Sequence, residues 1–258
     1  MRILVTNDDG INAPGLKVLE EIAARLSDDV WVVAPETNQS GASHSLTLHE
    51  PLRCREVGER RYAVRGTPTD CVIMGVRHIL LDNPPTLVLS GVNYGTNIAE
   101  DVTYSGTIAG AIEGALLGIR SFAMSLAIGF DQEGAIHWET PLAYGPKIVQ
   151  RLLDANLPEG IVMNVNFPDL APEAVAGISI ARQGRRDQNN LHIDKRLDTW
   201  GNPYFWFGFE RRKSNPAEGT DLWAIYKGQI SVTPLHVDLT NEPMHDRLKG
   251  IFADTRRS

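Results

Sequence analysis

The chain has 258 residues, of which 42% are hydrophobic and 22% charged, a composition that fits a soluble globular protein and excludes a disordered one. Its 25 basic and 32 acidic residues give a net charge of −7, which counts against duplex nucleic acid as a partner because neutralising phosphates requires a basic surface. No apolar stretch approaches the roughly 20 residues of a membrane span, so we expect no membrane anchor. The N-terminal apolar run becomes polar at Asn7, too soon for a signal peptide.

The first 130 residues predict alternating strands and helices. Apolar runs at 3–5, 30–34, 62–64, 87–90 and 122–127 have the length of buried strands. Helical apolar spacing predicts helices at 16–26, 108–117 and 141–153, with a further helix start at 66–70. A strand, a helix and a second strand within about 30 residues form a βαβ unit, so we expect an α/β fold with a doubly wound, mostly parallel sheet. The helix at 108–117 is rich in glycine and alanine and should pack very close to that sheet.

The pattern changes after a strand at 162–167, and from residue 180 onward the alternation of strands and helices is lost. We therefore expect a core at 1–180 and a C-terminal extension of the same domain at 181–258. Six aromatic residues between 200 and 209 predict a β-hairpin arm, with a pair of core strands as the alternative. A last strand at 230–235 and a helix at 240–252 follow.

Polar side chains follow the predicted strands, at the edge where ligands bind in such sheets. Asp8 and Asp9 are adjacent carboxylates directly after the first strand, and they raise each other's pKa unless a cation lies between them. Carboxylates suit a hard divalent ion such as Mg²⁺ or Mn²⁺, so we expect a metal site here, with an ordinary aspartate-rich turn as the alternative. Asn38 and Ser40, after the strand at 30–34, and Asn93, after the strand at 87–90, could complete the site. Asparagine and serine are, however, also standard loop formers.

A second ligand position is expected where Ser105, Gly106 and Thr107 precede the helix at 108–117. Free N–H groups at a helix start and two hydroxyl groups suit a phosphate, and an ordinary N-cap is the alternative. We expect a basic cluster later in the chain to form an ordinary solvated surface. Contact with an anionic substrate is the alternative. The cluster consists of Arg182, Arg185 and Arg186.

Several other kinds of site are excluded by their missing motifs. No GxGxxG follows the first strand and no GxxxxGK[ST] occurs, so we expect neither a dinucleotide site nor a P-loop. The seven histidines show no HxH or HExxH spacing, which counts against a zinc centre, although His44 lies in the second polar loop and could reach a site. Two cysteines without a CxxC motif, Cys54 and Cys71, predict reduced thiols in a cytoplasmic protein, with a single disulfide as the alternative.

Taken together, these motifs resemble the SurE family, the bacterial stationary-phase survival proteins, which are metal-dependent 5′-nucleotidases. The matching blocks run almost from one end of the chain to the other. They are ILVTNDDG at 3–10, APG at 13–15, VAP at 33–35, NQSGAS at 38–43, GTPTDC at 66–71, the stretch from SGVN to YSGT at 90–107, NVNFP at 164–168, TD at 220–221 and SVTPL at 231–235.

The resemblance implies a Rossmann-like core with one divalent cation per subunit, held by Asp8, Asp9, Ser40 and Asn93. It implies a nucleoside monophosphate whose phosphate lies near Asn38, Asn97, Ser105, Gly106 and Thr107. It also implies that the hairpin arm and the terminal helix are exchanged or packed between subunits, giving a homodimer or homotetramer. One departure is Ala99-Glu100, where the family usually has glycine before the acidic residue, so the backbone angles of this loop are expected to differ.

We therefore expect a phosphatase that hydrolyses nucleoside 5′-monophosphates, with 3′-nucleotides and short polyphosphate as further possible substrates. The metal would polarise the phosphoryl group and lower the pKa of a water that attacks in line, while Asp8 or Asp9 orients or deprotonates that water. A covalent aspartyl-phosphate is the mechanistic alternative. The alternative function is a nucleotide- or metabolite-binding regulator without turnover, which would not need the paired carboxylates.

Overall fold

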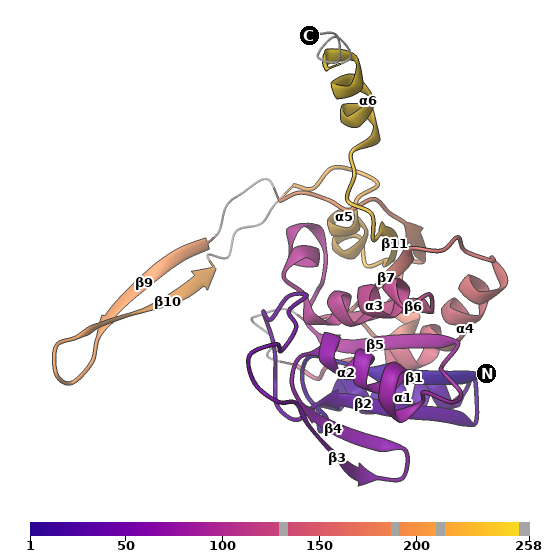
Figure 1. Cartoon of the computed structure of the whole chain (residues 1–258). Helices are drawn as coiled ribbons and strands as arrows, with labels where there is room; N and C mark the ends of the chain where they lie inside the picture. The colour runs from indigo at the N-terminus through magenta and orange to yellow at the C-terminus, as the bar shows by residue number, and fades with distance from the viewer. Residues whose placement is uncertain (129–133, 187–190, 210–214, 253–258) are drawn as a thin grey trace.

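The computed structural model describes residues 1–128, 134–186, 191–209 and 215–252, and within them nine strands form one sheet (Figure 1). The order of the strands across the sheet is β3-β4-β2-β1-β5-β6-β7-β11-β8. Their bounds are β1 Arg2–Thr6, β2 Asp29–Pro35, β3 Arg53–Gly58, β4 Arg61–Arg65, β5 Leu87–Tyr94, β6 Arg120–Ala127, β7 Ile161–Pro168, β8 Ile178–Ile180 and β11 Ile230–His236.

The six central strands, from β4 to β7, are all parallel, whereas β3 is antiparallel to β4 and β11 is antiparallel to β7. From β1 the chain moves outward through β2 to β4 and then returns to β5 on the other side of β1. The connections after β1 and β5 therefore leave in opposite directions, and a crevice for ligands is expected between them at the carboxyl ends of the strands.

Helices cover both faces of this sheet. On one face α1 packs against α4, and on the other α2 packs against α3. Alternate residues of β1 point to the two layers, with Ile3 and Val5 in the core beneath α1 and Leu4 in the core beneath α2. The helices are α1 Pro14–Ala24, α2 Pro68–Met74 with a π-helical turn at Gly75–Ile79, α3 Gly106–Leu116, α4 Glu139–Asp154, α5 Asp221–Tyr226 and α6 Glu242–Ile251, with 3₁₀ turns at Ala99–Thr103 and Pro172–Ala174. The predicted doubly wound α/β fold is confirmed.

Helix α3 lies very close to the sheet, as its glycines predicted. A Cβ atom on Gly114 would be 2.3 Å from the Ser121 hydroxyl, and one on Gly110 would be 3.0 Å from the Ser90 hydroxyl. Side chains at these two positions would push the helix away from β5 and β6.

Three elements were not predicted from the sequence. Strand β3 is exposed along most of its length and carries charged residues, so it has no apolar alternation to mark it. Strand β8 has three residues and α5 has six, which is too short for a periodic pattern.

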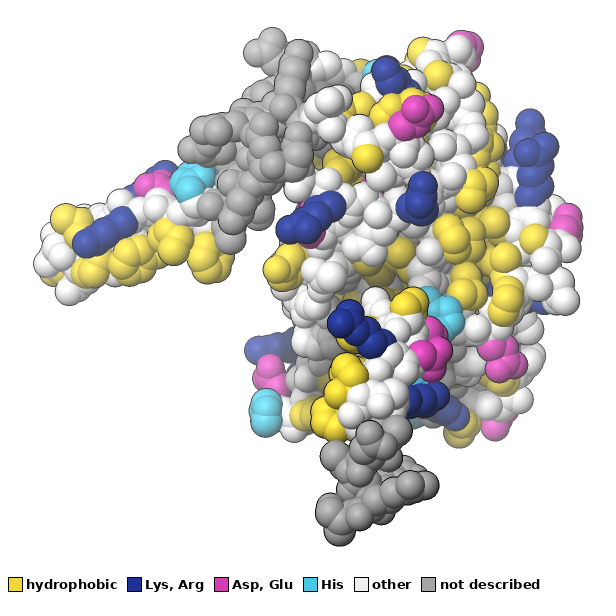
Figure 2. Space-filling view, turned by 90° about the horizontal axis from the view of Figure 1, so that it is seen from above, with side chains coloured by type: hydrophobic (Ala, Val, Ile, Leu, Met, Phe, Trp, Pro, Cys, Tyr) yellow, Lys and Arg dark blue, Asp and Glu magenta, His cyan; other side chains and the backbone are white. Residues whose placement is uncertain are grey.

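The arm is a hairpin of β9, Leu191–Leu197, and β10, Pro203–Phe209, which pair with each other and not with the main sheet. Figure 1 shows it projecting from the body, and Figure 2 shows hydrophobic side chains along it. Phe205, Trp206 and Phe207 are 58%, 60% and 76% exposed. The predicted hairpin arm is confirmed, and the alternative of a buried core strand pair is wrong.

Both cysteines are free thiols, as predicted, with Cys71 buried and Cys54 partly exposed. In the described part of the chain, no helix combines the length and the apolar character needed to cross a membrane.

Candidate metal and phosphate site

Asp8 and Asp9 lie just beyond β1, at the edge of the sheet where the neighbouring strand β5 also ends. The side chain of Asn7 donates a hydrogen bond to the carbonyl of Gly10 at 3.0 Å, which closes the turn that carries both aspartates. Asp8 is 4% exposed, and Asp9 is partly buried. The two carboxylates therefore sit together in a place where water stabilises their charges poorly.

The electrostatics of this pair favour a cation. Burial raises the pKa of Asp8 to about 6, opposed by a hydrogen bond from Thr107 and reinforced by the charge of Asp9. Burial also raises the pKa of Asp9, opposed by the N–H of Tyr94, which donates to Asp9 Oδ2 at 3.0 Å. Among the described residues, no cationic side chain contributes to the pKa of either aspartate. A bound divalent ion would supply the missing positive charge.

The loop after β2 brings Ser40 to the aspartates. The N–H of Gln39 donates to the carbonyl of Asp8 at 2.7 Å, so the residue next to it lies at the rim of the site. The side chain of Asn38 accepts from the N–H of Ser40 at 2.8 Å and fixes the turn between them. Both Asn38 and Ser40 are exposed, which leaves them accessible to a ligand.

Asn93 arrives from the end of β5. It precedes Tyr94, whose N–H donates to the carboxylate of Asp9, and this hydrogen bond connects the end of β5 to the loop after β1. The side-chain amide of Asn93 donates to the carbonyl of Gly95 at 2.9 Å. That bond occupies the Nδ2 donor and leaves Oδ1 as the atom suited to a cation.

The start of α3 lies against Asp8. The Thr107 hydroxyl donates to Asp8 Oδ1, and a Cβ atom on Gly106 would be 2.7 Å from Asp8 Cβ, so only glycine fits there. The Ser105 hydroxyl accepts from the N–H of Ile108 at 3.0 Å, which makes this side chain an N-cap, as the alternative interpretation held. The backbone N–H groups of the first helical turn still suit an anion.

Asn97, predicted near the phosphate, is buried with its amide donating to the Ser125 hydroxyl at 2.8 Å. The Asn97 NH₂ group carries two hydrogens, so its second N–H remains as a donor suited to a phosphate oxygen. His44 does not stand alone in its loop, since its Nε2 lies 3.0 Å from the carboxylate of Glu113 on α3.

The three arginines of the basic cluster differ in their exposure to solvent. Arg182 and Arg185 are exposed, in agreement with the solvated surface that the sequence favoured. Arg186 is only partly exposed, and its guanidinium donates to Asp101 at 2.9 Å and lies 3.5 Å from Glu100. The solvated interpretation is therefore wrong for Arg186, whose charge is used to bind acidic residues of the loop before α3.

The donor set fits a hard divalent cation. Two carboxylates and a hydroxyl from the loops after β1 and β2, and an amide carbonyl from the end of β5, are all oxygen donors. Below them lie the buried hydroxyls of Thr6 and Ser90, which are register partners on β1 and β5, and neither has a hydrogen-bond partner among the described residues. Oxygen atoms therefore continue from the loops into the sheet, as expected of a polar site.

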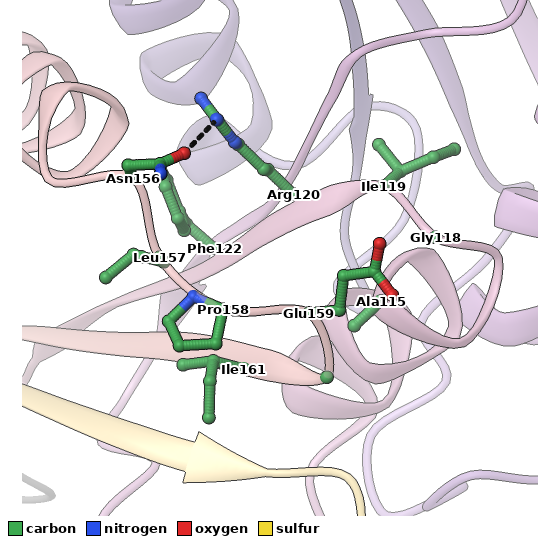
Figure 3. Close-up of a pocket in the computed structure, with 11 residues that line it drawn as sticks. Ala115, Gly118, Ile119, Arg120, Phe122, Asn156, Leu157, Pro158, Glu159 and Ile161 are labelled. Atoms are coloured by element: carbon green, nitrogen blue, oxygen red, sulfur yellow. Dashed lines mark hydrogen bonds between the residues drawn. The ribbon is translucent and has the colours of Figure 1, made fainter.

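Two other features lie away from this crevice. A cavity of about 260 Å³ opens where β6 and β7 begin, at the opposite edge of the sheet, between Arg120, Asn156 and Glu159 among others (Figure 3). Glu242, His245 and Asp246 form an exposed group on α6 whose ligand atoms lie within 4.8 Å of one another, and Lys249 is 3.4 Å from Asp246.

Sequence reasoning gave no role to the residues that hold the loop between β5 and α3. These are Asn164 and Asn166 on β7, Gln183, and Asp221 at the start of α5. The signal that could have found the first two is a pair of asparagines two residues apart in an otherwise apolar strand, because such residues face the same side and need partners when buried.

Comparison with known proteins agrees with this geometry. The model of the family described as "Survival protein SurE" matches residues 3–190. A protein named 5′-nucleotidase SurE from Methylobacterium nodulans is 61% identical over 252 residues, covering 98% of this chain and all of the relative. Another with that name, from Rhodopseudomonas palustris, is 62% identical over 98% of this chain and all of its own length.

A solved structure gives the same result for the fold. The crystal structure of the SurE protein from Aquifex aeolicus superposes with a TM-score of 0.82 at 42% identity, covering 97% of this chain and 99% of that one. Family model, relatives and structure all extend over the site described above, and the chain is a member of the SurE family.

Proposed function

We propose that this protein is a divalent-metal-dependent 5′-nucleotidase that hydrolyses nucleoside 5′-monophosphates to a nucleoside and inorganic phosphate. The observation that carries the proposal is the pair of buried and partly buried aspartates, which abuts the start of α3 and to which no cationic side chain of the described residues is paired. A site that only binds a nucleotide does not need two uncompensated carboxylates. The name shared by relatives about 60% identical to this chain supports the same activity.

In this proposal Asp8, Asp9, Ser40 and Asn93 hold one Mg²⁺ or Mn²⁺ ion. When bound, such an ion polarises a phosphoryl oxygen and lowers the pKa of a coordinated water. The phosphate lies at the start of α3, where the N–H groups of Gly106 and Thr107 face it, and the Asn38, Asn97 and Ser105 side chains surround it. The helix N-terminus adds partial positive charge that favours the anion.

The two aspartates differ in what they can do. Asp8 is deeply buried and its Oδ1 is fixed by Thr107, which suits a ligand of constant geometry. Asp9 is more exposed and is bound by one backbone N–H, so its second oxygen can orient the attacking water and accept its proton. In-line attack then expels the nucleoside oxygen on the opposite side of the phosphorus.

The central experiment measures phosphate release from AMP and GMP with Mn²⁺ or Mg²⁺, before and after addition of EDTA. We expect release that requires metal, stops with EDTA and is abolished in Asp9→Asn. Asp82→Asn is the matched control, because Asp82 is exposed and lies in the loop that precedes β5, whereas the aspartates lie where β1 and β5 end. Mn²⁺ should raise the unfolding temperature of the wild type and of the control but not of Asp9→Asn. Absence of release from any nucleotide with either metal would favour the regulator without turnover.

A second experiment tests for a covalent aspartyl-phosphate that is hydrolysed at its carbonyl carbon. A single turnover in ¹⁸O-water places the label in phosphate if water attacks phosphorus directly. If an aspartyl-phosphate forms and water attacks its carbonyl carbon, phosphate leaves and the ¹⁸O of that water remains in the aspartate carboxylate. Mass spectrometry of the peptide that contains Asp8 and Asp9 detects that label, and its presence would contradict direct attack.

We also propose that the protein works as a homodimer or homotetramer in the cytoplasm. Support for assembly comes from the exposed aromatic residues of the arm and from four exposed apolar residues at α6, which are Met244, Leu248, Ile251 and Phe252. Each would bury its apolar surface against another copy. The two free thiols support a reducing compartment.

A further inference from the structure

The loop between β5 and α3 is held by side chains from distant parts of the chain. At Asn97 the backbone N–H donates to Oδ1 of Asn166 at 2.9 Å, and the carbonyl accepts from Nδ2 of Asn164 at 2.7 Å. Both asparagines belong to β7. The backbone of Asn97 is therefore fixed before the chain reaches Ala99.

Ala99 has a backbone conformation that alanine avoids. Its φ is +52°, in the left-handed region where the Cβ atom approaches the following carbonyl, and the residue is fully buried. Its N–H donates to Oδ2 of Asp221 at 2.9 Å, and its carbonyl accepts from Nε2 of Gln183 at 2.8 Å. These two side chains bind both backbone polar groups of Ala99 and hold it in this conformation.

Asp221 is a buried carboxylate that accepts hydrogen bonds from backbone N–H groups of the described residues. Oδ2 binds Ala99, while Oδ1 accepts from the N–H of Gly184 and the N–H of Leu222, both at 2.8 Å. Burying a carboxylate is costly unless its oxygens are well supplied with donors. Three donors from three separate parts of the chain converge on this one side chain, which links the loop before α3 to the segment that leads into the arm.

The conformation of Ala99 is passed on to the start of α3. Ala99 begins the 3₁₀ turn Ala99–Thr103, and the carbonyl of Asp101 in that turn accepts from the N–H of Ser105 at 3.0 Å. Ser105 is the N-cap of α3, and the next residue, Gly106, lies directly against Asp8. A change in the angles of Ala99 would therefore move the helix start relative to the aspartates.

We propose that Asp221 is a positioning residue for this active site, because its carboxylate holds Ala99 in the left-handed conformation that sets the start of α3. This inference rests on the proposed function, since it concerns the place where the phosphate of the substrate would bind. Asp221 itself touches neither the substrate nor the cation in this proposal. It acts through Ala99, and Gln183 assists it from the carbonyl side.

The test is a double-mutant cycle between Asp221 and Ala99. Asp221→Asn keeps the shape and one oxygen for Gly184 and Leu222, but it turns an N–H₂ group toward the N–H of Ala99 and loses that bond. Ala99→Gly removes the steric penalty of the left-handed conformation, so the turn forms without help from Asp221. If Asp221 acts through Ala99, the glycine will rescue the asparagine variant.

We expect Asp221→Asn to raise the KM for AMP by about ten-fold with a smaller change in kcat, because the phosphate-binding helix start is displaced. Ala99→Gly alone should keep KM within about two-fold of the wild type, and the double variant should return to about the same value. Mn²⁺ binding measured by calorimetry should weaken in Asp221→Asn and recover in the double variant, because the displaced helix start carries Thr107, whose hydroxyl donates to Asp8. Asp82→Asn is again the control for loss of a charge.

The outcomes separate this inference from the proposed function. A wild type that releases no phosphate overturns the proposed function. An active wild type with an Asp221→Asn variant of normal KM, or with a raised KM that Ala99→Gly does not lower, overturns the role of Asp221. If Asp221→Asn does not fold, Gln183→Met replaces it in the cycle, because it removes only the bond to the Ala99 carbonyl from an exposed residue. Gln183→Met should raise the KM for AMP by less than Asp221→Asn does. This rise should also disappear when Gln183→Met is combined with Ala99→Gly.

Discussion

The hydroxyl of Thr107 donates a hydrogen bond to the carboxylate of Asp8, 99 residues earlier in the chain. This bond joins the start of α3 to the loop after β1, and it lowers the pKa of a carboxyl that burial has raised. It therefore stabilises the ionised form of Asp8, which is the form that binds a cation.

Replacing Thr107 by valine removes the donor and keeps the shape of the side chain. We expect the affinity for Mn²⁺ at neutral pH to fall about ten-fold, since a hydrogen bond to a charged group is worth about 1.5–3 kcal/mol. Calorimetric titration with Mn²⁺ measures the effect. Thr107→Ser retains the hydroxyl and should bind almost as well as the wild type, whereas equal affinity in the valine variant would contradict this account.

Gly106→Ala tests how closely α3 must approach Asp8. The added methyl carbon would lie 2.7 Å from Asp8 Cβ, so the helix start or the aspartate has to move. We expect a loss of about 1–3 kcal/mol in the free energy of unfolding and a KM for AMP raised about ten-fold. Gly58→Ala is a suitable control because its nearest contact would be an ordinary 3.7 Å. A normal KM in Gly106→Ala would show that the helix start does not bind the phosphate.

The metal-free protein should lose stability as the pH rises through the range in which Asp8 ionises. The pKa of Asp8 is about 6 in the folded protein against an ordinary 3.8, so between these values the folded state binds more protons than the unfolded state. Protonation of Asp8 therefore adds to the free energy of unfolding, by about 3 kcal/mol at most. This contribution is fully present below the pKa of the unfolded state and is lost as the pH rises through the pKa of the folded state. Urea unfolding in EDTA at a series of pH values measures it. The free energy of unfolding of the wild type minus that of Asp8→Asn should fall as the pH rises. A difference in unfolding free energy that stays constant or rises would be inconsistent with the raised pKa of Asp8.

The arm provides a test of assembly. Phe205 and Phe207 lie two residues apart on one face of β10, and Phe207 is paired with Ile193 across the hairpin. Serine at both phenylalanines should convert the wild-type oligomer to a smaller species in size-exclusion chromatography with light scattering, because the apolar face that would bind another copy is removed. Lys195→Ser alters the residue opposite Phe205 without removing apolar surface and should leave the mass unchanged. A monomeric wild type, or an unchanged mass in the double variant, would show that this face does not mediate assembly.

Much of the fold could be predicted because the central strands are buried on both faces. Residues 3–5 and 87–89 are fully buried, so they form uninterrupted apolar runs that stand out in the sequence. The candidate ligands could be predicted for a related reason: parallel strands end at the same edge, so polar residues after β1, β2 and β5 must come together.

The residues that hold the loop before α3 could not be found in this way. Asn166 binds Asn97 across 69 residues, and Asp221 binds Ala99 across 122. Such pairs leave no periodic signal, and aspartate at a helix start has an ordinary role as part of a cap. The sequence predicted altered backbone angles where alanine replaces the family's usual glycine, whereas Ala99 has a left-handed φ of +52° and is held there by Gln183 and Asp221.

The order of the elements also bears on when activity begins during synthesis. Every proposed ligand precedes residue 108, so an unfinished chain on the ribosome already contains the complete donor set. The side chains that bind the backbone of Asn97 and Ala99 are made later, from β7 onward, and α5 follows only after the arm. Until then the backbone groups of this loop bind water, and the helix start has no fixed place beside Asp8. A nascent chain therefore carries the ligands long before it is a working phosphatase.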